Sequence, residues 1–317
     1  MTNIGLKTPQ RNLVLPTFLN MPLNVANLVL EKLEPVDRLS ARKVCRSLKT
    51  AVEKFGLRFD DIDLILREQS VDIDLNGTAI IYTNAANARR IVCRNGEKKI
   101  IDRENFVERA LKDFKILSNH ARNVVIWNMT EHGCGIVSSL IQFLKPEKCI
   151  LVMEIELNKF SFDEVLTILP CFEDKELKKI ELSCIASIER FEQITHLEQW
   201  KNADKLVFWD SKIASTMIIH MFHFKCFRIH DMDEVPAQIA IQMRDNLLRR
   251  STFQSCEIIF AKSKSNPIEL AKVFKPDYIG DSELFLIHFS NGNSQFDISL
   301  KYWETDSNYF LLKIIKL

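Results

Sequence analysis

The stretch Asn123–Leu157, NVVIWNMTEHGCGIVSSLIQFLKPEKCILVMEIEL, contains two apolar, strand-like runs with one amphipathic, helix-like run between them. Strand-like runs of the same kind recur along the chain at 123–129, 149–157, 177–185, 205–211 and 226–232. They start 26, 28, 28 and 21 residues apart, and helix-like runs fill the gaps between them. The middle of the chain is therefore predicted to be a series of β-α units.

Regular β-α units of about 20–30 residues are typical of a curved solenoid with an architecture similar to that of leucine-rich repeats. A doubly wound α/β domain gives a similar order of elements and stays open as the alternative. The near-constant spacing of the strands favours the solenoid.

The flanking segments alternate apolar and polar residues with period two, which predicts antiparallel strands. Asn76-Gly77, Asn95-Gly96 and Asn291-Gly292 each lie between two such runs, and this dipeptide is a strong hairpin signal. The predicted fold is α+β. Its segments are a flexible tail at 1–14, a three-helix module at 15–56, antiparallel hairpins at 57–102, the β-α repeats at 103–260 and a β-rich cap at 261–317.

The composition is that of a folded protein without a strong overall charge. Of 317 residues, 46% are hydrophobic and 27% are charged, and the formal net charge is +1. No apolar stretch reaches the roughly 18 residues of a membrane span, and the N-terminus lacks a signal-peptide pattern. The eight cysteines occur singly, mostly within apolar runs, as reduced core thiols do. We expect an intracellular protein, cytoplasmic or nuclear, with no membrane contact and no direct nucleic-acid binding.

The sequence lacks the common motifs of catalysis and cofactor binding. It contains no Walker loop, G-x-G-x-x-G, G-x-S-x-G, H-E-x-x-H or C-x-x-C. The best metal candidate is the set His220, His223, Cys226 and His230, but the phenylalanines around it favour core or boundary histidines. We therefore expect no metal, no cofactor and no catalytic residue, and a binding surface instead.

The segment 21–48, MPLNVANLVLEKLEPVDRLSARKVCRSL, places three short helical patterns and two prolines close together. Apolar residues follow helical spacing in the first pattern, Pro35 ends that pattern, and Gly56 follows the last one. A module of this size is too short to build an independent core. The segment is therefore predicted to cover its apolar stripe with another protein surface.

This segment resembles the F-box, the three-helix motif that binds the adaptor in cullin–RING ubiquitin ligases. It departs from the motif at Asn24, where Glu is common, and at Leu48, where Trp is usual. The positions that match are Met21-Pro22, Val29, Leu33, Pro35, Asp37, Leu39 and Val44-Cys45-Arg46. Further along, the stretches RALKDFKILSNH, FSFDEVLTILP, FEQITHLEQWKNADKL and NPIELAKVFKPDY resemble the FTH domain, which accompanies an F-box in a large nematode family. This second resemblance covers roughly 103–275.

The two resemblances together imply the substrate receptor of an SCF-type ubiquitin ligase. The F-box would dock to a Skp-type adaptor and through it to a cullin, the FTH region would hold an unknown target protein, and catalysis would belong to other subunits. The residues expected to contact the adaptor are Pro22, Val25, Leu28, Val29, Leu33, Pro35, Leu39, Val44, Cys45 and Leu48. The alternative is a scaffold outside any ligase that binds a protein, or an RNA–protein complex, through the repeat surface.

Overall fold

The computed structural model divides the chain into two compact units, residues 1–58 and 59–317. The structure describes residues 23–317 except for 34, 43, 45, 56–58, 85–89, 95–96, 102–104, 132–134, 146–149, 185–190, 210–213, 281–282 and 293.

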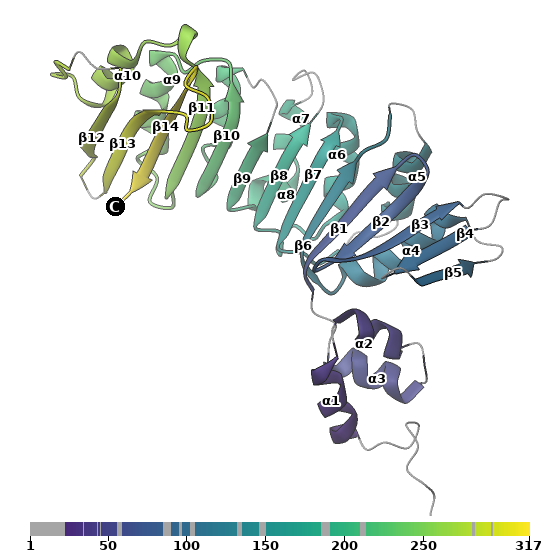
Figure 1. The fold of residues 1–317 in the computed structure, drawn as a ribbon. Coiled ribbons are helices and arrows are strands. Elements are labelled where there is room, and N and C mark those ends of the chain that lie inside the picture. Colours follow the sequence, from purple (N-terminus) through teal and green to yellow (C-terminus); the bar gives the residue numbers. More distant parts are fainter. Residues whose placement is uncertain are drawn as a thin grey trace, which may run out of the picture. The chain divides into compact units, whose positions relative to one another are not determined.

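The first unit contains three short helices, α1 (Leu23–Lys32), α2 (Pro35–Arg42) and α3 (Arg46–Phe55) (Figure 1). Its interior is formed by Leu30, Leu48 and Val52, which are at most 3% exposed. Arg38 Nε donates a hydrogen bond of 2.8 Å to the carbonyl oxygen of Leu30 and so links α2 to α1. The apolar interior consists of few side chains, as the sequence predicts for a module of this length.

The second unit is built on one long sheet whose centre is parallel (Figure 1). Neighbouring parallel strands follow one another in sequence, except that β1 precedes the hairpins and then pairs with β6. The parallel strands are β1 (Phe59–Arg67), β6 (Ala121–Asn128), β7 (Glu154–Phe160), β8 (Lys179–Cys184), β9 (Lys205–Trp209), β10 (Cys226–Met232) and β11 (Ser255–Ala261). Because the order never reverses at a switch point, the sheet is not doubly wound.

Antiparallel strands extend the same sheet at both ends. At one end lie β2 (Ser70–Leu75), β3 (Thr78–Asn84), β4 (Arg90–Arg94) and β5 (Glu97–Ile101). At the other end, β11 pairs with β14 (Tyr309–Lys316), followed by β13 (Gln295–Tyr302) and β12 (Phe285–Ser290). The predicted segments 57–102, 103–260 and 261–317 all contribute to this one sheet, and the boundaries between them stay predictions.

The helices of the second unit cover one face of the sheet (Figure 1). They are α4 (Phe106–Ser118), α5 (Gly135–Leu144), α6 (Phe162–Ile168), α7 (Phe191–Thr195), α8 (Glu198–Asn202), α9 (Ala237–Gln242) and α10 (Pro267–Phe274). Alternate residues of the strands are buried, as in Ile180 and Leu182 of β8, because successive side chains point to opposite faces. Burying such a side chain stabilises the fold by roughly 1.5–3 kcal/mol.

The hairpin predicted at Asn76-Gly77 is confirmed. Leu75 of β2 lies opposite Thr78 of β3, and Asn76 and Gly77 have φ angles of 50° and 87°. These two positive φ angles are the ones that a tight hairpin turn requires. β4 and β5 also pair as antiparallel strands, although Asn95-Gly96 itself lies outside the described residues. β12 and β13 pair across the connection that contains Gly292, whose φ is 88°.

Two elements differ from their predicted limits. The strand expected over 149–157 begins only at Glu154, because Ile150 forms an isolated bridge with Phe172 before the sheet starts. Within the helix-like run 211–224, the structure has a 3₁₀ helix over Ser215–Met221. Ile218 and Met221 are both fully buried, and the three-residue period of a 3₁₀ helix turns both of them toward the core.

Candidate binding surfaces

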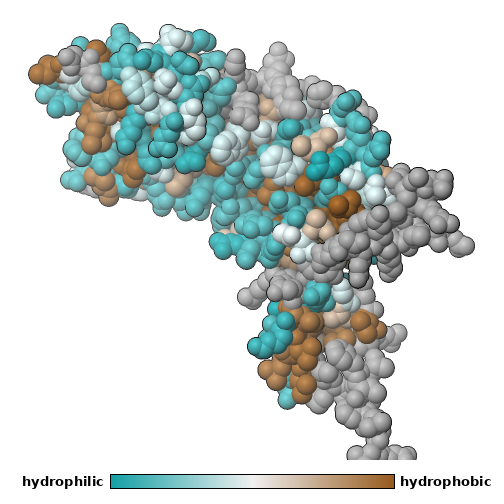
Figure 2. Space-filling view, in the orientation of Figure 1, coloured by the Kyte–Doolittle hydropathy of each residue, from teal (hydrophilic) through white to brown (hydrophobic). Residues whose placement is uncertain are grey.

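The first candidate surface consists of exposed apolar side chains in the unit 1–58. Val25 and Leu28 of α1 are 39% and 61% exposed, and Val44, after α2, is 66% exposed. Val25 and Leu28 are three residues apart, so they project from the same side of their helix. Figure 2 shows apolar residues gathered over α1. Exposed apolar side chains that gather in this way are typical of a surface on which another protein packs.

The other predicted adaptor-contact residues have different placements. Val29 and Leu33 are half-buried, whereas Leu48 is 3% exposed and belongs to the interior of its unit. Outside the described part of the chain lie Pro22 and Cys45, together with the side chains of Pro35 and Leu39.

The second candidate surface is the face of the sheet opposite the helices, which we call the open face. Three tetrapeptides alternate acidic and apolar residues, with DIDL at 61–64, DIDL at 72–75 and EIEL at 154–157. Every Ile and Leu in them is at most 1% exposed and lies on the helix side. Since strand residues alternate between the two faces, all six carboxylates of these tetrapeptides lie on the open face.

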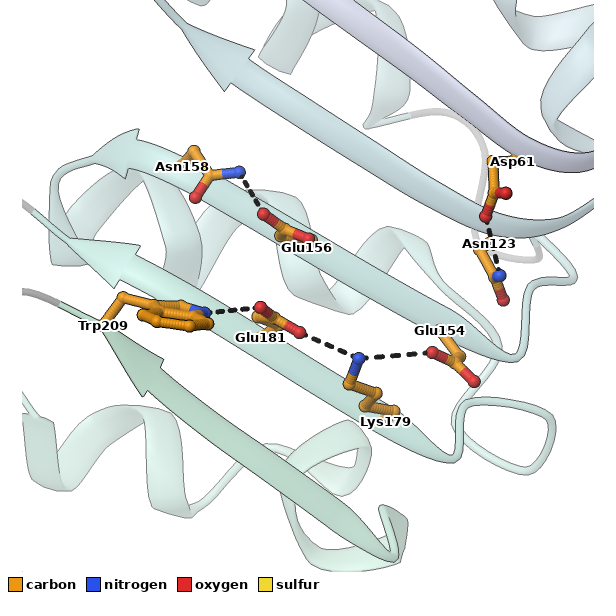
Figure 3. A network of polar contacts seen from close by, with 8 residues as sticks. All are labelled: Asp61, Asn123, Glu154, Glu156, Asn158, Lys179, Glu181 and Trp209. Atoms are coloured by element: carbon orange, nitrogen blue, oxygen red, sulfur yellow. Dashed lines mark hydrogen bonds and ion pairs between the residues drawn. The ribbon is translucent and has the colours of Figure 1, made fainter. Parts of the chain in front are cut away.

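Two asparagines hold carboxylates of the open face by hydrogen bonds (Figure 3). Asn123 Nδ2 on β6 donates to Asp61 Oδ1 on β1 over 2.9 Å. Asn158 Nδ2 on β7 donates to Glu156 Oε1 over 2.7 Å. Asn158 is 3% exposed although it lies on this face, so neighbouring side chains cover its amide. The amides are neutral, so these hydrogen bonds satisfy carboxylate oxygens without supplying a compensating positive charge.

Lys179 on β8 is the cation at the centre of the network in Figure 3. Its Nζ lies 2.8 Å from Glu181 and 3.4 Å from Glu154. Burial by itself lowers the pKa of this ammonium, but the hydrogen bonds and charges of the two glutamates outweigh burial and raise it. Trp209 Nε1 on β9 also donates to Glu181. Lys179 and Trp209 therefore compensate Glu181 within the chain.

Four carboxylates form a line across the open face, which we call the acidic row. Asp74 of β2 lies opposite Asp63 of β1, and Glu156 of β7 lies opposite Glu181 of β8. Val125 of β6 lies between the two pairs, opposite both Asp63 and Glu156. Each pair thus sets two like charges directly across a β-ladder, which destabilises a sheet.

Asp63 and Glu156 are the central carboxylates of the acidic row, and their surroundings disfavour the charged form of each. Burial raises the pKa of Asp63, and the charges of Asp74 and Asp61 raise it further. Burial also raises the pKa of Glu156. The hydrogen bond from Asn158 and the charge of Lys179 oppose this rise, while the charges of Glu181 and Asp63 add to it. Their charged forms therefore cost more here than in water.

Aromatic side chains lie next to the acidic row. Trp127 of β6 lies two residues beyond Val125 on the same face, which is about 6.6 Å along the strand. Trp209 is half-buried and stacks on His230 of β10, with ring centroids 3.6 Å apart. Indole rings half-exposed on a sheet offer both apolar area and a π face to a partner.

The histidines singled out as a metal candidate do not converge. The ring nitrogens of His223 lie 2.8 Å from the carbonyl oxygen of Trp200 and 3.1 Å from that of His220. His230 lies instead on the open face against Trp209. His223 therefore bonds to backbone carbonyls, the satisfied arrangement that the sequence favoured for it. Burial lowers the pKa of His223, and the two backbone contacts oppose this.

The sequence matches the F-box domain model over residues 18–60 and the FTH domain model over residues 135–277. The chain is an F-box protein with an FTH domain. It is similar to F-box A protein 224 of Caenorhabditis elegans, with 26% identity over 311 residues, which cover 92% of this chain and 80% of that protein. The F-box holds the exposed α1 surface, and the FTH domain holds most of the β-α units.

Membership of these families indicates the kind of partner to expect. F-box proteins are generally substrate receptors of SCF ligases, and F-box and FTH proteins are typically adaptors instead of enzymes. The kind of partner that an F-box implies is a Skp-type adaptor with a cullin behind it. Among the helices that the structure describes, none is long and apolar enough to cross a membrane.

Sequence reasoning alone did not find the acidic row. The signal was present, because the acid–apolar tetrapeptides at 61–64, 72–75 and 154–157 already separate charge from apolar side chains by face. What was missing is the order of the strands. Only the pairing of β1 with β6 brings the first two tetrapeptides beside the third.

Proposed function

We propose that this chain is the substrate receptor of an SCF-type ubiquitin ligase. The F-box docks to a Skp-type adaptor and through it to a cullin, and the FTH region holds a target protein. The chain itself catalyses nothing and accelerates ubiquitin transfer by holding the target near the catalytic subunits. We propose that it does this inside the cell, in the cytoplasm or the nucleus, as expected of an F-box protein.

The observation that supports adaptor docking best is the exposure of Leu28 within the region that matches the F-box. Its side chain is 61% exposed, and Val25 on the same side of α1 and Val44 after α2 are exposed as well. Interfaces between permanent partners bury apolar side chains of this kind. Pro22, Val29, Leu33, Pro35, Leu39 and Cys45 complete the proposed contact set, as they do in the motif.

Leu48 has a different part in this proposal. The F-box motif usually has Trp there, and here the side chain is buried among Leu30 and Val52. Leu48 therefore supports the adaptor surface from inside its unit. The missing indole and the missing acid at Asn24 lower adaptor affinity relative to a typical F-box.

The test is copurification of the full chain with a Skp-type adaptor. Leu28→Asp places a carboxylate on the proposed interface and is expected to abolish copurification. The matched control is Leu286→Asp on β12, where the original leucine is also 61% exposed but lies in the other unit. The proposal fails if wild-type chain recovers no adaptor, or if the two variants lose adaptor equally.

The FTH region suits target binding because consecutive β-α units leave one extended sheet face without helices. We propose that these units form a leucine-rich-repeat-like solenoid, whose stacked strands supply an extended binding surface. The departures at Asn24 and Leu48 favour a second candidate, a scaffold that binds a protein or an RNA–protein complex without a ligase. Normal target binding by a chain that never recovers adaptor would support the scaffold.

A further inference from the structure

The open face carries a strong local charge in strands β2, β1, β6, β7 and β8. Among the described residues of these five strands, seven carboxylates and two cations, Arg67 and Lys179, lie on the open face. The carboxylates are Asp61, Asp63, Asp72, Asp74, Glu154, Glu156 and Glu181. The chain as a whole has a net charge of +1, so this excess is local.

Among the described residues, the two central carboxylates of the acidic row, Asp63 and Glu156, form no ion pair. Arg67 pairs with Asp72 over 3.0 Å, and Lys179 pairs with Glu181 and Glu154. Among the described residues, Asp63 accepts no hydrogen bond and forms no ion pair. Glu156 accepts only from the neutral amide of Asn158. Neither carboxylate forms an ion pair with a described residue, although the charge of Lys179 acts on Glu156 through space and lowers its pKa.

Like charges that face each other in the acidic row destabilise the sheet, and the fold does not require them. Asp63 faces Asp74 and Glu156 faces Glu181, and any neutral polar residue would serve the open face of a sheet as well. Burial and these neighbours hold the pKa of both central carboxyls above its usual range. A cation from outside would relieve the repulsion on both sides of Val125 at once.

We propose that the acidic row and Trp127 bind an extended segment of the target protein that carries arginine or lysine side chains. This inference rests on the proposed function, since it names the chemistry of the target that the FTH region holds. The charge of the surface decides the class of partner: phosphate groups of nucleic acids or lipids are repelled, whereas cationic side chains are attracted.

The dimensions of the row agree with a short peptide segment. From Asp74 to Glu181 the row crosses four strand spacings, which is about 19 Å. An extended chain covers that distance with about six residues, and its alternate side chains point to one side. Three cationic side chains at alternate positions of such a peptide therefore span the distance from the Asp63–Asp74 pair to the Glu156–Glu181 pair. Trp127 lies two residues beyond Val125 on the same face, where the guanidinium of an arginine can stack on its indole ring.

The remainder of the open face has a different character. From β9 to β14 its cations include Lys205, Arg228 and Lys313, and Arg228 and Lys313 both pair with Glu257. The open face is thus acidic at one end and mixed to basic at the other. Such an uneven distribution of charge fixes the direction in which a charged segment lies.

The test measures binding of a defined probe to the full chain. The probe is a fluorescein-labelled ten-residue peptide that alternates arginine and serine, and fluorescence anisotropy is recorded at low and at physiological salt. Asp63→Asn combined with Glu156→Gln is expected to weaken binding at least tenfold. The control, Glu192→Gln with Glu198→Gln, removes the same charge from exposed positions on α7 and α8 and is expected to keep affinity within twofold.

Three outcomes overturn the proposal: no binding by the wild-type chain, an equal loss in the control variant, or displacement of the peptide by calcium ion at constant ionic strength. The last would assign the row to a metal. Leu28→Asp separates this test from the previous one, because it is expected to abolish adaptor recovery and leave the affinity for the peptide unchanged. If Leu28→Asp and wild type both lack adaptor but bind the peptide, the ligase assignment fails and the acidic row stands.

Discussion

Neutralising the centre of the acidic row is expected to stabilise the protein. Asp63→Asn keeps the size and polarity of the side chain and removes the like charge opposite Asp74. Glu156→Gln does the same opposite Glu181, and its amide oxygen can still accept the hydrogen bond from Asn158. Most substitutions destabilise a protein, so a gain would mark a site kept for binding and not for folding.

The size of the gain follows from the two cross-strand pairs. A directly opposed pair contributes about 0.2–1 kcal/mol, and the partial exposure of Asp63 places its pair near the lower end. Because Lys179 partly compensates Glu181, Asp63→Asn with Glu156→Gln is expected to raise the free energy of unfolding by at most about 1 kcal/mol. For a unit of this size, that corresponds to a rise in Tm of at most about 2–4 °C.

The dependence on pH distinguishes electrostatic relief from better packing. A carboxyl group whose pKa is raised by folding stabilises the native state fully below its unfolded pKa, and this stabilisation is lost as pH rises through the folded pKa. The difference in Tm between Asp63→Asn/Glu156→Gln and wild type should thus be largest near pH 7 and shrink toward pH 4. Differential scanning calorimetry at several pH values measures it, with Glu192→Gln as the control. A lower Tm for the double variant at pH 7 would refute the reasoning.

Two further predictions concern the core and the thiols. Tyr82 is 2% exposed and its hydroxyl donates to Asp113 of α4 over 2.9 Å, so Tyr82→Phe should lower the free energy of unfolding in urea by about 1.5–3 kcal/mol. A change below about 0.5 kcal/mol would show that this bond contributes little. Burial raises the pKa of Cys184 to about 12, so in the native protein iodoacetamide at pH 8 should modify the half-exposed Cys226 well before Cys184. Peptide mass mapping measures this order, and equal labelling would contradict it.

Local patterns in the sequence were sufficient for the identity of most elements. Apolar runs at 20–30-residue spacing predicted the parallel strands, and Asn76-Gly77 predicted a hairpin, because positive φ angles select asparagine and glycine. The F-box was also readable from sequence, since its motif lies within about forty consecutive residues. In each case the physical cause acts between neighbours along the chain.

The limits of elements and the exposure of single residues were less predictable. Ile150 looks like the start of a strand, but its backbone bonds to the segment at Cys171, so β7 begins at Glu154. Leu48 lies in the apolar stripe of the F-box and is buried, whereas Leu28 of the same stripe is exposed. Such differences depend on which segments pack against a side chain in the folded chain.

Sequence alone determined that Asp61, Asp63, Glu154 and Glu156 share their strands with buried apolar residues, because the period of a strand is two. It also determined that β-α units follow one another in the chain. Only the tertiary structure decided that β1, after its hairpins, pairs in parallel with β6, and that the helices leave one face of the sheet open. The acidic row arises from that pairing. Carboxylates about ninety residues apart in sequence become near neighbours there, and no local pattern can specify a contact whose free energy depends on the whole sheet.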